Sequence, residues 1–133
     1  MNLDQLRAAF PWPATSPLLP FDGEGWLHPD TEGALAEVLP GARLAIEVGT
    51  WMGLSTRHLL ERNPDLTVVC IDTWLGSFEH FGNDYQNRIP RLYDQFVAGV
   101  LATAADFTLL YAPNINSYKR FADASFAPTT IAW

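Results

Sequence analysis

The apolar residues of this chain follow two spacings, and each spacing predicts one kind of element. Short continuous apolar runs, typical of strands buried on both faces, cover residues 44–48, 66–71 and 107–111. Apolar residues repeat every three to four positions in segments that predict helices, at 3–10, 30–39, 53–62, 89–102 and 117–124. Because strands alternate with helices, the pattern favours an α/β fold with a parallel sheet and right-handed crossovers.

Proline and glycine positions divide the chain. Pro11, Pro13, Pro17 and Pro20 make residues 1–29 an expected proline-rich N-terminal arm rather than regular structure. Asp30 is the expected N-cap of the helix that follows. Residues 30–133 then form the predicted domain, which is long enough for a single hydrophobic core.

Composition narrows the possible partners. The 133 residues carry a net charge of −7, and their eight Lys and Arg side chains are scattered, which argues against a nucleic-acid partner. No apolar run approaches the ~20 residues that cross a bilayer, and no signal-peptide core is visible, so a cytoplasmic protein without membrane contact is expected. The single cysteine, Cys70, falls in a predicted strand and is expected to be a buried thiol.

The segment L-A-I-E-V-G-T-W-M-G-L-S, residues 44–55, carries the strongest functional signal. A strand ends near an acidic residue, Glu47, and two glycines, Gly49 and Gly53, precede a helix. Such a turn lets the backbone approach a ligand, and the N–H groups of a helix start favour an anionic group. About 20 residues later a second strand ends on Asp72, a spacing at which an acid accepts hydrogen bonds from ribose hydroxyls.

These motifs resemble a known enzyme family. The segment E-V-G-T-W-M-G resembles the first motif of class I S-adenosylmethionine-dependent methyltransferases, and Asp72 falls where that family has its ribose-binding acid. The phrases I-D-T-W-L-G-S and L-Y-D-Q-F are most similar to the small-molecule O-methyltransferase branch. The resemblance covers residues 30–117. It implies a Rossmann-like three-layer αβα fold with a mostly parallel sheet, truncated after the third strand, and transfer of a methyl group from S-adenosylmethionine to a small molecule.

The resemblance also implies roles for single residues. Gly49 and Gly53 would allow close approach of the methionine part of the cofactor. Glu47 would bind the amino group of this part, and Ser55 would bind its carboxylate. Asp72 would bind the ribose. The remaining implied cofactor-binding residues are Thr50 in the glycine turn, Trp74 near the adenine, and Asn116 and Ser117 after the third strand.

Several alternatives stay open. The glycines can simply shape a structural turn, Asp72 can cap a loop, and Trp74 can be a core aromatic residue. His80 is a candidate general base or an ordinary loop histidine, and no catalytic residue is assigned. No histidine or cysteine spacing predicts a metal site.

The missing strands also leave the activity open. The chain could be a truncated, non-catalytic cofactor-binding domain, or a lyase or hydrolase that acts on the same cofactor. Because the first strand would be a bare apolar edge, a homo-oligomer that covers this edge is expected.

Overall fold

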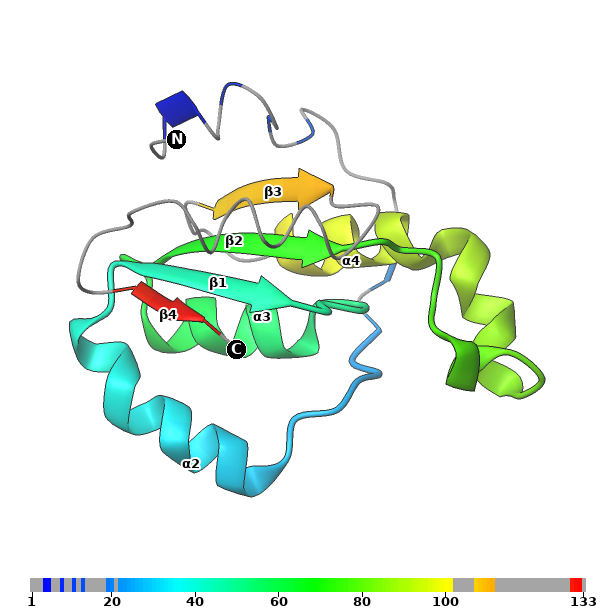
Figure 1. Cartoon of the computed structure of the whole chain (residues 1–133), viewed down its shortest axis with the longest axis horizontal. Helices are drawn as coiled ribbons and strands as arrows, with labels where there is room; N and C mark the ends of the chain where they lie inside the picture. Colours follow the sequence, from blue (N-terminus) through cyan, green and yellow to red (C-terminus); the bar gives the residue numbers. More distant parts are fainter. Residues whose placement is uncertain are drawn as a thin grey trace.

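The computed structural model describes residues 22–101, 107–111 and 130–132, with 4, 5, 8, 11, 13, 19 and 20. Within these residues four strands form one parallel sheet of order β3-β2-β1-β4 (Figure 1). The strands are β1 (Leu44–Val48), β2 (Thr67–Asp72), β3 (Phe107–Tyr111) and β4 (Thr130–Ala132). The sheet confirms the predicted α/β class.

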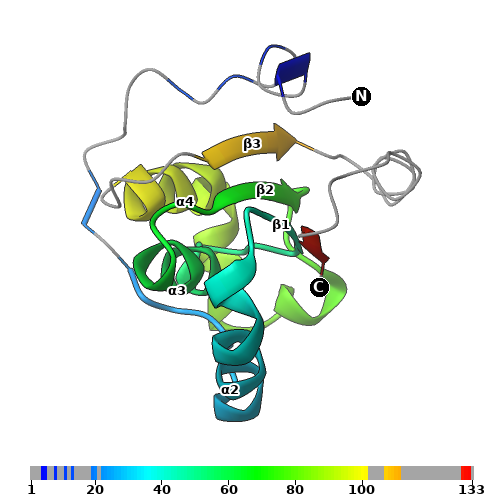
Figure 2. The same cartoon turned by 90° about the vertical axis from the view of Figure 1, so that its left-hand side faces the viewer.

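Helices connect β1 to β2 and β2 to β3. The α-helices are α2 (Pro29–Val38), α3 (Leu54–Arg62) and α4 (Leu92–Leu101), and the 3-10 segments are η1 (Leu39–Gly41), η2 (Phe78–His80) and η3 (Asp84–Arg91). Figure 2 shows α3 and α4 on the same face of the sheet. The segment between β2 and α4, residues 73–91, extends past the carboxyl ends of the strands and is called the 73–91 lobe below (Figure 1).

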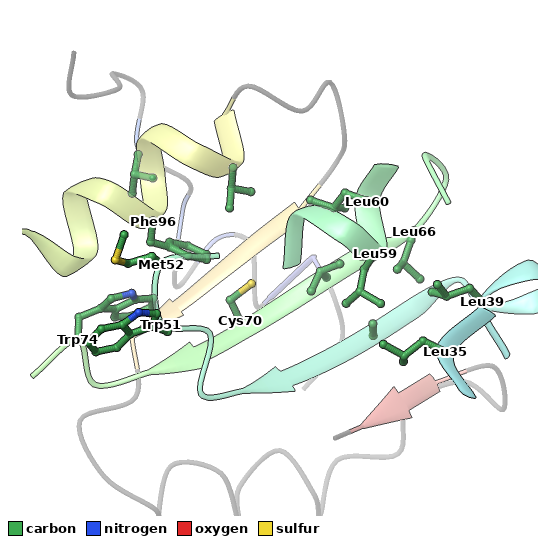
Figure 3. Close-up of a cluster of buried hydrophobic side chains, with 14 of the residues drawn as sticks. Leu35, Leu39, Trp51, Met52, Leu59, Leu60, Leu66, Cys70, Trp74 and Phe96 are labelled. Atoms are coloured by element: carbon green, nitrogen blue, oxygen red, sulfur yellow. The ribbon is translucent and has the colours of Figure 1, made fainter. Parts of the chain in front are cut away.

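The core lies between the sheet and the helices α3 and α4. Alternate strand residues Ala45, Val68 and Cys70 belong to one buried cluster together with the apolar side chains of these helices. The intervening residues Ile46 and Val69 are buried as well. Both faces of the strands are therefore covered, as their continuous apolar runs predict. Figure 3 shows the cluster extending from Leu35 and Leu39 to Trp51 and Trp74 at the strand ends.

Two helix starts differ from the prediction. The N-cap of α2 is His28, whose Nδ1 accepts a hydrogen bond from the N–H of Asp30 at 3.3 Å, and Asp30 lies inside the helix. Proline at the first helical position explains the shift, because the fixed φ of Pro29 suits a helix start and its missing N–H needs no partner. The helix predicted from residue 89 begins as an α-helix only at Leu92. Pro90 lies in η3, because proline lacks the N–H that a regular α-helix needs.

The fourth strand corrects the expected truncation after the third. β4 pairs in parallel with Leu44–Ile46, so the edge of β1 that was expected to be bare has a neighbour over three residues. Because a strand of three residues is too short to show a period, the sequence indicated only that a fourth strand would begin near the closing I-A-W. Cys70 is buried as predicted.

Some predictions fall outside the described residues. The helix at 117–124 does, and so does most of the helix at 3–10. Among the residues that the structure describes, no helix has the length and apolar character of a membrane span.

Candidate functional site

The site predicted from the sequence lies at the carboxyl ends of β1 and β2. In the turn after β1, three residues have positive φ: Gly49 (84°), Trp51 (50°) and Gly53 (89°). This conformation costs a non-glycine residue about 1–2 kcal/mol, so surrounding contacts must hold the turn. Hydrogen bonds of 2.9 Å join the Gly49 N–H to the Ile71 carbonyl and the Gly53 N–H to the Thr50 carbonyl.

Glu47 of β1 is buried against the first turn of α3, with 1% of its surface exposed. Its two carboxylate oxygens accept hydrogen bonds from the hydroxyls of Ser55 and Thr56. Burial raises the pKa of Glu47 to about 7; the two hydroxyls lower it, and the nearby Asp72 carboxylate raises it further. Ser55, expected to bind a cofactor carboxylate, therefore donates to the protein's own acid.

Asp72 joins the two loops at the strand ends. Its Oδ2 accepts from the N–H of Trp51 at 2.9 Å, and its Oδ1 accepts from the N–H of Trp74 at 2.8 Å. Hydrogen bonds to a charged acceptor are stronger than neutral ones. Trp51 and Trp74 both have positive φ, so Asp72 holds two strained residues in place. The acid expected to bind a ribose thus has a structural role, as one of the alternatives proposed.

The two motif glycines have different surroundings. A Cβ added at Gly53 would lie 2.9 Å from Cγ2 of Val100 and 3.1 Å from Cδ2 of Phe96, so α4 fills the space beside this residue. A Cβ added at Gly49 would meet no atom within 4 Å. Gly53 therefore permits close packing of α4 on the turn, whereas the space beside Gly49 is open to a ligand.

The other predicted cofactor-binding residues have different environments. Thr50 is buried, and its hydroxyl has no hydrogen-bond partner among the described residues. Trp74 packs against α4, with ring centroids 5.2 Å from Tyr93 and 5.4 Å from Phe96, and is a core aromatic residue. Ser117 and Asn116 lie outside the described residues.

Sequence reasoning missed a second site, beside the first. His80 is 9% exposed, and its ring contacts Trp26, Trp51 and Tyr85 next to a cavity of about 380 Å³. The lobe sequence W-L-G-S-F-E-H-F-G-N-D-Y shows an aromatic cluster. Trp26 is distant in the chain, and its apolar side chain indicated only that the N-terminal arm packs on another part of the protein. No group of three or more His, Cys, Asp or Glu side chains in the described part of the chain is placed to hold a metal ion.

Comparisons with known proteins point to a family other than the one the motifs resemble. The family model of the glutamine synthetase catalytic domain matches residues 78–133, less than half of the chain. Over 38 residues the chain is 63% identical to the gamma-glutamylethanolamide synthetase of Streptomyces coelicolor, covering 29% of this chain and 8% of that protein. Over 47 residues it is 45% identical to type-1 glutamine synthetase 2 of Dictyostelium discoideum, covering 35% and 9%.

A third relative is also a ligase that matches over a short segment. The chain is 50% identical over 38 residues to the glutamate–isopropylamine ligase of a Pseudomonas species, covering 29% of this chain and 8% of that protein. The aligned residues thus span about a tenth of the length of these curated relatives. Among solved structures, a chain described as "a putative O-methyltransferase from Klebsiella pneumoniae" aligns with a TM-score of 0.44 and 19% identity, over 95% of this chain and 48% of that one.

The ligase matches overturn the predicted function. Methyl transfer, the S-adenosylmethionine cofactor and the alternatives that act on the same cofactor are wrong, because the matched family consists of ligases that use ATP and divalent metal ions. The first motif (residues 44–55) and Asp72 precede the matched segment, whereas L-Y-D-Q-F (residues 92–96) lies within it. A strand, a glycine turn and a helix with acidic strand ends recur in many parallel sheets, so this unit does not by itself specify a cofactor.

Proposed function

We propose that this chain is part of an ATP-dependent ligase that joins the γ-carboxyl group of glutamate to an amine. The observation that carries the proposal is the match of residues 78–133 to the glutamine synthetase catalytic domain. The names of two relatives support it, since one synthesises gamma-glutamylethanolamide and the other joins glutamate to isopropylamine.

The proposed reaction requires cationic groups that bind its anionic substrates. A carboxylate resists attack by an amine, so ATP must activate it, and both glutamate and ATP are anions that need cationic partners. The matched segment contains the adjacent cations Lys119 and Arg120, in the sequence N-S-Y-K-R-F. We propose that this pair binds the anionic substrates; both residues lie outside the described part of the chain.

An assay of product formation tests the proposal. The full-length protein of which this chain is proposed to be a part is incubated with glutamate, ATP, magnesium and, in turn, ammonia, ethanolamine or isopropylamine, and γ-glutamyl amides are measured by mass spectrometry. We expect product only with ATP, and about tenfold less with Arg120→Ala, because a charge-assisted contact is lost. The control Arg62→Ala removes an exposed arginine that pairs with Glu32 outside the matched segment, and it should leave the rate unchanged. Absence of product with all three amines from the folded full-length protein would contradict the proposal.

We also propose that residues 30–133 form a Rossmann-like unit. The strand order β3-β2-β1-β4 and the parallel pairing support it. A small-molecule substrate, a cytoplasmic location, a homo-oligomer and ligand contacts of Gly49 and Thr50 stay predictions. Because β4 covers part of the β1 edge, the reason first given for the homo-oligomer is weaker.

A further inference from the structure

The 73–91 lobe and the segment before α2 line a partly open cavity of about 380 Å³. Its lining residues are Trp26, Glu79, His80, Asn83 and Tyr85. Pockets for small organic molecules start at roughly 300 Å³, so this cavity has the size for a small ligand. Gly49 and the glycine turn are not part of its lining.

Aromatic rings form much of the wall. Trp26 stacks on His80 with a centroid distance of 5.8 Å and an interplanar angle of 16°, and it lies 5.2 Å from Tyr85. Trp51 contacts the His80 ring at 4.2 Å. Trp26 is 59% exposed, which leaves part of a large aromatic surface accessible beside the cavity. Aromatic faces carry partial negative charge and attract cations.

The polar groups of the cavity are those that a cation prefers. The pKa of Glu79 is lowered by hydrogen bonds from its own backbone N–H and from Ser77, so its exposed carboxylate is ionised at neutral pH. Nδ1 of His80 accepts a hydrogen bond from the Ser77 N–H at 2.9 Å, which ties the ring to the backbone of the lobe. No lysine or arginine is among the lining residues.

Ion pairs and hydrogen bonds hold the walls of the cavity in place. Arg88 of η3 pairs with Asp22 and lies 3.7 Å from Glu24, which fixes the segment before α2 against the lobe. The side chain of Asn83 donates to the Glu79 carbonyl at 2.7 Å and accepts from the Tyr85 N–H at 3.0 Å. Ring faces and carboxylate are therefore positioned before any ligand binds, which reduces the ordering cost of binding.

We propose that this cavity binds a small organic ammonium ion, with the cation against the faces of Trp26 and Tyr85 and its charge opposite the Glu79 carboxylate. An anionic ligand would be repelled by Glu79, and a neutral planar ligand would gain nothing from it. The proposed ammonium site consists of the cavity residues alone and does not depend on the proposed ligase function.

Direct binding of choline tests the proposal. Choline is titrated into the folded chain while the indole N–H resonances are followed by NMR, and the same is done with the neutral alcohol in which a tert-butyl group replaces the trimethylammonium group. We expect saturable millimolar binding of choline that shifts the Trp26 signal, with about tenfold weaker binding of the neutral alcohol. Equal affinities for the two compounds, or no saturable shift with choline, would overturn the proposal.

Variants locate the site. Trp26→Ala should weaken choline binding about tenfold and Trp26→Phe should restore part of it, because phenylalanine keeps an aromatic face. Glu79→Gln should weaken binding about threefold, as expected for a solvent-screened charge. The matched control Glu37→Gln removes an exposed acid of α2 and should have no effect. Choline binding that survives Trp26→Ala unchanged would place the ligand elsewhere and refute the assignment.

Discussion

The two regions at the carboxyl edge of the sheet differ in how far their acidic groups are exposed. In the turn after β1, the carboxylates of Glu47 and Asp72 accept hydrogen bonds from hydroxyls and backbone N–H groups of the protein itself. In the 73–91 lobe, the Glu79 carboxylate also accepts hydrogen bonds from its own backbone N–H and from Ser77, but it is exposed, and part of the Trp26 ring is accessible beside a cavity. The first region has the familiar ligand-binding sequence, but the second has the accessible surface that we propose binds a ligand.

Burial explains this difference. A buried carboxylate must find donors within the protein, because an unpaired polar group in the interior is costly. Acids at strand ends therefore acquire internal partners whether or not a ligand exists. An exposed carboxylate near accessible rings faces no such requirement, and its placement is better evidence for a ligand.

Removing the aromatic side chain beneath the glycine turn should have the largest effect. Phe96 is fully buried between α4 and the turn. Phe96→Ala should lower the free energy of unfolding by about 3–5 kcal/mol, through lost burial and the cavity left behind. Urea unfolding measures the change. Tyr93→Ala, at a partly exposed position on the same helix, is the control. An equal loss of stability in both variants would contradict the inference that the turn depends on buried packing.

The buried Glu47 should make stability depend on pH. Its pKa is raised from 4.5 to about 7, so the folded state binds more protons than the unfolded state between these values. Stability contributed by the protonated form is therefore complete below about pH 4.5 and is lost as pH rises through about 7. Relative to the native chain, Glu47→Gln should gain up to about 3 kcal/mol across this window.

Urea unfolding of both proteins at several pH values provides the measurement for Glu47. Glu61→Gln changes an exposed glutamate of α3 that pairs with Arg57, and it serves as the control. A stability difference between Glu47→Gln and the native chain that stays constant with pH would show that Glu47 keeps its ordinary pKa.

The two motif glycines offer a matched pair of substitutions. Both have positive φ, but only the added Cβ at Gly53 collides with α4. Gly49→Ala should destabilise by about 1–2 kcal/mol through backbone strain alone. Gly53→Ala should lose a further 1–3 kcal/mol, roughly, through overpacking. Thermal unfolding of both variants checks this. Equal losses of stability would mean that α4 shifts to accommodate the added Cβ without destabilising the fold.

The smallest effect is expected at the ion pairs of the lobe. Arg88→Ala removes the contacts with Asp22 and Glu24. Because partly exposed ion pairs contribute little, the loss should be about 1 kcal/mol or less and should shrink in high salt. Hydrogen exchange in residues 22–28 should nevertheless become faster. The exposed Arg91→Ala is the control, and unchanged exchange would show that other contacts hold this segment.

Local patterns predicted the elements that local forces govern. The strand at Phe107–Tyr111 and the strand and helix flanking the glycine turn were predicted to within one or two residues, because continuous apolar runs and glycine turns are visible in a short window. The N-cap at Asp30 and the helix start at Ile89 were wrong, since Pro29 and Pro90 shifted both starts. The functional interpretation failed because an acid at a strand end looks the same whether it binds a ligand or its own backbone.

By itself, the sequence determined the parallel α/β order, the burial of Cys70 and the position of the glycine turn, since these follow from side-chain polarity and backbone freedom at neighbouring positions. Only the tertiary structure decided that Ser55 donates to Glu47, that α4 fills the space at Gly53, and that Trp26 joins His80 and Tyr85 around a cavity. Contacts between distant segments depend on how whole elements pack, and no local pattern contains that information.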